Sequence, residues 1–108
     1  MIIETKTVND FLLATILVKE ANLNTSVSFR SEITAIIDQG HKAIIVDFEN
    51  VDYVDSSFLG ALVSCLKYAL ANKADVSVIS LNKDIKNLFQ MIRMDKVFKI
   101  HDDVPEYK

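Results

Sequence analysis

The chain has 108 residues, of which 50% are hydrophobic and 25% are charged. This length is enough for one domain with a buried core but not for two, and the composition is typical of globular proteins. The formal net charge of −3 argues against a polyanionic partner such as nucleic acid, and no apolar run approaches the roughly 18 residues of a membrane span.

The start of the chain and its cysteine content both bear on the cellular compartment. Residues 1–4 lack the basic start and the apolar stretch of a signal peptide. The single cysteine, Cys65, excludes an internal disulfide and fits a reducing compartment. We therefore expect a cytoplasmic protein.

The chain begins with a predicted hairpin. Residues 2–7 and 11–18 are rich in β-forming side chains, and residues 8–10 form a plausible turn between them. The second run is apolar on both faces, so we expect an inner strand that is covered on two sides.

A loop and a helix are expected next. Residues 19–25 are mostly polar and read as a loop, and Thr25 or Ser26 is expected to cap the helix that follows. Gly40 provides the stop signal. The apolar stripe of this helix consists of Phe29, Ile33, Ile36 and Ile37.

The second half of the chain predicts a strand–helix–strand unit. Residues 43–48 form a buried strand, residues 56–71 an amphipathic helix, and residues 76–81 a second strand. Two strands joined in this way are expected to pair in parallel.

The C-terminal part predicts a shorter helix and a last strand. Asn82 is expected to cap the helix, residues 97–100 to form the strand, and residues 101–108 to be a polar tail. Together the elements predict a single α/β domain, with a mixed sheet of four to five strands and helices packed on it.

Residues 55–57, Asp-Ser-Ser, fall where the buried strand ends and the helix must begin. The start of a helix has unpaired backbone N–H groups and the positive end of the helix dipole. A hydroxyl at this position is either a cap or the acceptor of a negatively charged group. From the residues alone a cap is the more economical interpretation for Ser56, and Asp55 is a second candidate for that role.

The segment 55–60, Asp-Ser-Ser-Phe-Leu-Gly, resembles a known signature. Asp-Ser-Ser-x-Leu-Gly at the head of such a helix is similar to the STAS family, in particular the bacterial anti-sigma-factor antagonists. The order of elements resembles a STAS domain over about residues 2–102, which leaves residues 103–108 as a tail. The segment 94–98 resembles the family's link between last helix and last strand.

The resemblance implies a mechanism of partner switching. In the family, the first serine after the aspartate is phosphorylated by the anti-sigma factor, which is a serine kinase that uses ATP and magnesium; here this is Ser56. The unphosphorylated protein binds the anti-sigma factor and frees the sigma factor, and a phosphatase later restores the hydroxyl. The expected contact residues are Asn22, Asp55, Ser56, Ser57, Phe58 and Gly60.

Two positions depart from the family pattern. Asn22 stands where relatives often have an aspartate that helps the kinase reaction or the partner contact, while Arg30 and Ile33 fall on positions that the family fills with Arg and Leu. Phe58 stands where the family commonly has Gly, and its ring either packs inward or is an exposed contact. Gly60 keeps the later glycine, and with Ser64 and Ala71 it forms a stripe of small residues suited to close helix packing or docking.

Three other functions are alternatives. The first is a STAS interaction module that is not phosphorylated, in another signalling or transport assembly, which Asn22 and Phe58 favour. The second is a domain that senses a small ligand or nucleotide at the carboxyl ends of the strands. The third is an enzyme, but Cys65, His41 and His101 have no partners at catalytic or metal-binding spacing. We expect no cofactor and no metal.

Overall fold

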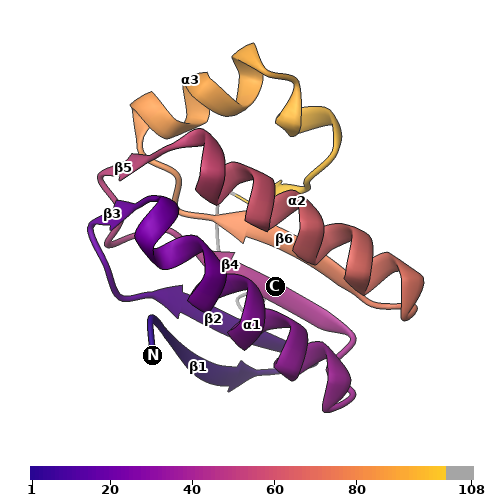
Figure 1. Ribbon diagram of the computed structural model, residues 1–108. Helices are drawn as coiled ribbons and strands as arrows, with labels where there is room; N and C mark the ends of the chain where they lie inside the picture. Colours follow the sequence, from indigo (N-terminus) through magenta and orange to yellow (C-terminus); the bar gives the residue numbers. More distant parts are fainter. Residues whose placement is uncertain (102–108) are drawn as a thin grey trace.

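The computed structural model describes residues 1–101 and shows a five-stranded mixed sheet in the order β1-β2-β4-β6-β7 (Figure 1). Strand β1 pairs antiparallel with β2, and all other neighbours in this sheet are parallel. The strands are β1 (Ile3–Val8), β2 (Phe11–Ile16), β4 (Ala43–Asp47), β6 (Asp75–Ile79) and β7 (Ile100–His101).

Within the described residues, three α-helices and a second, two-stranded sheet accompany the large sheet. Helices α1 (Leu23–Asp38) and α2 (Ser56–Ala71) lie side by side over one face of the large sheet (Figure 1). Helix α3 (Lys83–Met91) and the short 3₁₀ helix η1 (Met94–Lys96) follow β6. The small sheet pairs β3 (Glu20–Ala21) in parallel with β5 (Tyr53–Val54).

Alternating side chains of the inner strands build the core. Ala14, Val46 and Val78 are fully buried and belong to the same cluster as the rings of Phe29 and Phe58 from the two helices. Because neighbouring residues of a strand point to opposite faces, the register of β2, β4 and β6 brings one apolar set under the helices. The single predicted domain, with its mixed sheet and packed helices, is confirmed.

The parallel unit and the turns agree with the sequence prediction. Strands β4 and β6 pair in parallel, Asn82 caps α3 with its side chain, and α1 stops just before Gly40, which has a φ of 101°. Strand β2 is an inner strand, and its second face is half-buried.

Several boundaries differ from the prediction, among them the ends of β2 at Ile16 and of β6 at Ile79. Helix α1 begins at Leu23 with Asn22 as its cap, so the expected caps Thr25 and Ser26 lie inside its first turns. The expected loop over residues 19–25 therefore contains β3 and the start of α1. The last strand begins at Ile100 and not at residue 97, because residues 97–99 form a turn and bend after η1. His101, the first residue of the tail expected over residues 101–108, belongs to β7 instead. The rest of that tail, which includes residues 103–108, lies outside the described residues.

Candidate partner-binding site at the starts of helices α1 and α2

The small sheet places the starts of two helices next to each other. Ala21 of β3 lies opposite Val54 of β5, and the backbone N–H of Asp55 donates to the carbonyl of Ala21 over 3.0 Å. The next residue after each strand is the N-terminal cap of a helix, Asn22 for α1 and Asp55 for α2. Residues that are distant in sequence are thereby brought to one end of the helix layer (Figure 1).

The carboxylate of Asp55 holds both helix starts. Its Oδ1 accepts a hydrogen bond from the N–H of Phe58 over 2.9 Å, and its Oδ2 accepts one from the N–H of Leu23 over 3.1 Å. A carboxylate that accepts backbone N–H groups at a helix start is stabilised by the helix dipole as well. Asp55, and not Ser56, is therefore the cap of α2.

Asn22 caps its own helix. Its side-chain oxygen accepts from the N–H of Asn24 over 3.0 Å, and its backbone N–H donates to the hydroxyl of Thr25 over 3.1 Å. Because the side chain is neutral, the two neighbouring caps do not bring two carboxylates together. Asn22 thus serves as the cap of α1 without adding a negative charge to this end of the helix layer.

Ser56 and Ser57 are the first two residues of α2, and both are exposed. The hydroxyl of Ser56 is therefore accessible to an enzyme, while capping is carried out by its neighbour. Ser57 differs from Ser56 in that it lines a hollow between α1 and α2.

This hollow, which we call the α1–α2 groove, has a volume of about 410 Å³. Leu23 and Val27 of α1, which are 64% and 67% exposed, supply apolar surface, and Arg30 supplies a positive charge. Ser57, Gly60 and Ser64 of α2 form the opposite wall. The groove thus combines exposed apolar side chains with an arginine, a residue type that is enriched at protein–protein interfaces.

The ring of Phe58 is buried. It is 0% exposed and packs against the ring of Phe29, with 4.6 Å between ring centroids. Of the two alternatives for this residue, the structure shows the inward one, so the expected contact through an exposed Phe58 ring is wrong. The residue instead joins α2 to α1 beneath the groove.

Gly60 has no steric reason within the described chain to be glycine. A Cβ added there would meet no neighbouring element within 4 Å. Gly60, Ser64 and Ala71 are all exposed, so their stripe faces solvent and is available for docking rather than for packing inside the domain. Glycine inside a helix costs roughly 1 kcal/mol relative to alanine.

A second contact joins α1 and α2 near their other ends. The hydroxyl of Tyr68 donates to a carboxylate oxygen of Asp38, and this hydrogen bond raises the pKa of Tyr68. The two helices are thus linked at both ends, with the Phe29–Phe58 ring pair between the links.

The remaining reactive candidate is buried. Cys65 is fully enclosed, and desolvation raises the pKa of its thiol to about 12, although the charge of Arg30 acts in the opposite direction. Within residues 1–101, no group of three or more His, Cys, Asp or Glu side chains is placed to hold a metal ion. None of the helices in this part of the chain has the length and apolar character needed to cross a membrane.

Known proteins of similar sequence are named as anti-sigma factor antagonists. The chain is 26% identical over 83 residues to the anti-sigma-B factor antagonist of Staphylococcus aureus, which covers 77% of this chain and 77% of the relative.

Solved structures share the fold. An anti-sigma-factor antagonist (STAS) domain protein from Planctomyces limnophilus superimposes with a TM-score of 0.84 at 17% identity, covering 97% of this chain and 93% of that one. The phosphorylated form of the Bacillus cell fate determinant SpoIIAA gives a TM-score of 0.73 at 19% identity and covers 97% and 94%. The model of the STAS domain family matches residues 3–107, nearly the whole chain, and the chain therefore belongs to this family.

Proposed function

We propose that this chain is an anti-sigma-factor antagonist that binds its anti-sigma factor through the α1–α2 groove and the exposed start of α2. The observation that carries the proposal is the groove itself, with Leu23 and Val27 exposed beside Gly60. Exposed apolar side chains and a helical glycine both cost stability, and neither is explained by contacts inside the described chain. A partner that packs closely against this surface explains both. The name of the Staphylococcus relative supports the class of partner.

We further propose that phosphorylation of Ser56 releases the partner. The acting kinase is the anti-sigma factor, with its own ATP and magnesium, and a phosphatase reverses the step. This chain is then a regulator without catalytic activity of its own, working in the bacterial cytoplasm. The contact residues are Asn22, Asp55, Ser56, Ser57 and Gly60, with Phe58 supporting them from below.

The position of Ser56 explains why the modification would affect binding more than folding. In the free protein, a phosphate at the start of α2 lies in water near backbone N–H groups and the positive end of the helix dipole. In the complex the same group is enclosed beside the carboxylate of Asp55. Desolvating an unpaired phosphate is costly.

Phosphorylated protein is therefore expected to bind the anti-sigma factor at least about tenfold more weakly than unmodified protein, or about 1.4 kcal/mol. Ser56→Asp carries one charge where phosphate carries nearly two, so its effect should be smaller. The test uses a serine-kinase anti-sigma factor from the same genome, with mass spectrometry to locate the phosphate and calorimetry to measure affinity.

Ser57→Ala is the matched control, because it removes the neighbouring hydroxyl and leaves Ser56 in place. It should still be phosphorylated, whereas Ser56→Ala should not. Phosphate on Ser56→Ala would contradict the assignment of the acceptor. Equal affinities of the phosphorylated and unmodified proteins would contradict release by phosphorylation.

Gly60→Ala should separate folding from binding. The free energy of unfolding is expected to rise by about 0.5–1 kcal/mol, because alanine is the better helix former and its Cβ has room. Affinity for the anti-sigma factor should fall, since the added methyl group stands in the groove. Lys67→Ala, an exposed change elsewhere on α2, serves as the control for both measurements. Unchanged affinity of Gly60→Ala would remove Gly60 from the contact surface.

The second candidate is a STAS module that binds its partner without being phosphorylated. Asn22 favours it, because the family's aspartate, which assists the kinase reaction or the partner contact, is replaced by a side chain engaged in capping. This function predicts that the anti-sigma factor, or another partner, binds the chain but leaves Ser56 unmodified. The mass spectrometry above distinguishes the two candidates.

A further inference from the structure

Strand β1 forms an edge of the large sheet. Its one neighbour among the described strands is β2, and the side chains of residues 4–7 are exposed. The N–H of Leu17 donates to the carbonyl of Ile2. This bond shows which residues of β1 direct their backbone groups toward β2, because every second residue of an antiparallel strand does so. In such an antiparallel pair, Ile3, Thr5 and Thr7 direct their N–H and C=O groups away from β2.

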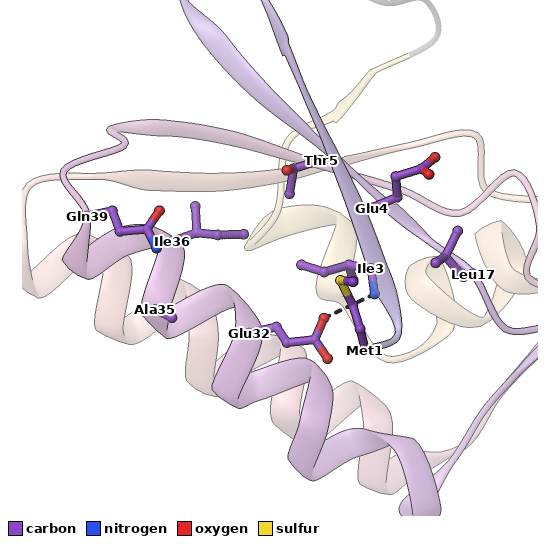
Figure 2. A pocket seen from close by; sticks show the side chains of 9 residues that line it. All are labelled: Met1, Ile3, Glu4, Thr5, Leu17, Glu32, Ala35, Ile36 and Gln39. Atoms are coloured by element: carbon purple, nitrogen blue, oxygen red, sulfur yellow. Dashed lines mark hydrogen bonds between the residues drawn. The ribbon is translucent and has the colours of Figure 1, made fainter.

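Glu32 of α1 closes one end of this edge. Its carboxylate accepts hydrogen bonds from the N–H groups of Ile2, over 3.0 Å, and Ile3, over 3.1 Å. Figure 2 shows the bond between Glu32 and Ile3. Farther along, the outward groups of Thr5 and Thr7 have no strand of residues 1–101 beside them. The open part of the edge is therefore centred on Thr5.

A hollow of about 510 Å³ lies between this edge and α1 (Figure 2). Met1, Ile3, Leu17, Ala35 and Ile36 give it apolar walls, and Met1 and Leu17 are 96% and 47% exposed. Side chains of Ile3 and Thr5 face the hollow, on the helix side of the sheet. A strand added to β1 would direct its own alternate side chains to the same side.

We propose that β1 pairs antiparallel with β1 of a second copy of this chain, about a two-fold axis at Thr5. Thr5 then lies opposite Thr5 of the partner subunit, and the two residues exchange N–H···O=C bonds. Thr7 lies opposite Ile3 of the partner subunit and donates to its carbonyl. The two sheets become one, with helices α1 and α2 of both copies on the same side, since both helices lie over one face of the sheet (Figure 1).

Charge selects this register. With the axis at Thr5, Glu4 lies opposite Lys6 of the partner subunit, and by symmetry the same attractive pair forms a second time. Moving the axis by one residue brings Lys6 against Lys6 of the partner subunit, or Glu4 against Glu4 of the partner subunit. Opposite charges across strands stabilise a pair, and like charges destabilise it. The strand is thus complementary to itself, and this favours a second copy over an unrelated strand.

The proposal is tested by sedimentation velocity of the full chain from micromolar to millimolar concentration. Wild type is expected to change from monomer to dimer with concentration. Lys6→Glu and Glu4→Lys should each raise the dissociation constant by at least about tenfold, because two attractive pairs become repulsive. The double variant Glu4→Lys/Lys6→Glu exchanges the charges and should restore the dimer. Lys67→Glu on α2 makes the same change of net charge away from the edge and should have no effect.

Thr5→Pro gives a second test that does not depend on charge. Proline removes the N–H that is directed outward, and edge strands tolerate it where the N–H faces solvent. The variant should remain monomeric at every concentration, with a cooperative thermal transition showing that it folds.

A wild-type chain that stays monomeric at millimolar concentration overturns the proposal, and leaves the edge to a strand of another protein. A dimer that Lys6→Glu does not weaken, or that the charge exchange does not restore, also overturns it. The α1–α2 groove lies on the other side of α1, toward α2, so binding of the anti-sigma factor is measured independently of these outcomes.

Discussion

Phe58→Ala is expected to lower the free energy of unfolding by about 3–5 kcal/mol, as is usual for a fully buried phenylalanine. The substitution removes the ring that packs on Phe29 and leaves a cavity between α1 and α2. Loss of the favourable contact between two aromatic rings adds to the cost of burying less apolar surface. Chemical denaturation measures the change in the free energy of unfolding, with the same dependence on denaturant concentration (m value) used for both proteins.

Tyr53→Ala, which truncates an exposed aromatic ring near the same helix start, is the matched control. It should change stability by less than about 1 kcal/mol. If Phe58→Ala were as mild as this control, the ring would not be part of the core.

Asp55→Ala is expected to cost about 2–3 kcal/mol. Removal of a capping side chain costs about 0.5–2 kcal/mol, and here the same carboxylate also accepts the N–H of Leu23 at the start of a second helix. Hydrogen exchange should show faster opening of the first turns of both α1 and α2.

Asp52→Ala provides the comparison, because it deletes an exposed carboxylate three residues earlier in the same segment. Its effect should stay within about 0.5 kcal/mol. Asp55→Asn keeps an acceptor oxygen, so its loss of unfolding free energy should lie between those of Asp55→Ala and Asp52→Ala. Protection lost only in α2 would mean that Asp55 does not hold α1.

The larger elements of the fold were accessible from the sequence because each has a clear local pattern. The helix over residues 56–71 repeats its apolar positions at helical spacing, and the strand over residues 43–48 contains a short continuous apolar run, which is typical of a buried strand. Strands β3 and β5 contain only two residues each, and so carry no period. The existence of this small sheet depends on contacts between distant residues.

The candidate site was predicted in part. The motif at residues 55–60 located the start of α2, and the cap was left open between Asp55 and Ser56, whose side chains both suit that role. The cap of α1 was missed, although asparagine is among the residue types preferred at an N-cap. The α1–α2 groove and the second contact of Asp55 depend on how the two helices pack against each other. Local sequence patterns do not indicate this packing.

The links between α1 and α2 have a consequence for how such proteins diverge. Asp55, the Phe29–Phe58 pair and the Tyr68–Asp38 contact hold the helix layer together with groups beneath or beyond the groove. Leu23 takes part in these links through its backbone N–H alone, and the exposed side chains of Leu23 and Val27 lie outside them, so side-chain changes at these positions cost the fold little. After a gene duplication, substitutions at these two positions can give the two copies different partners while the rest of the fold stays the same. Each copy then binds its own partner and not the partner of the other copy.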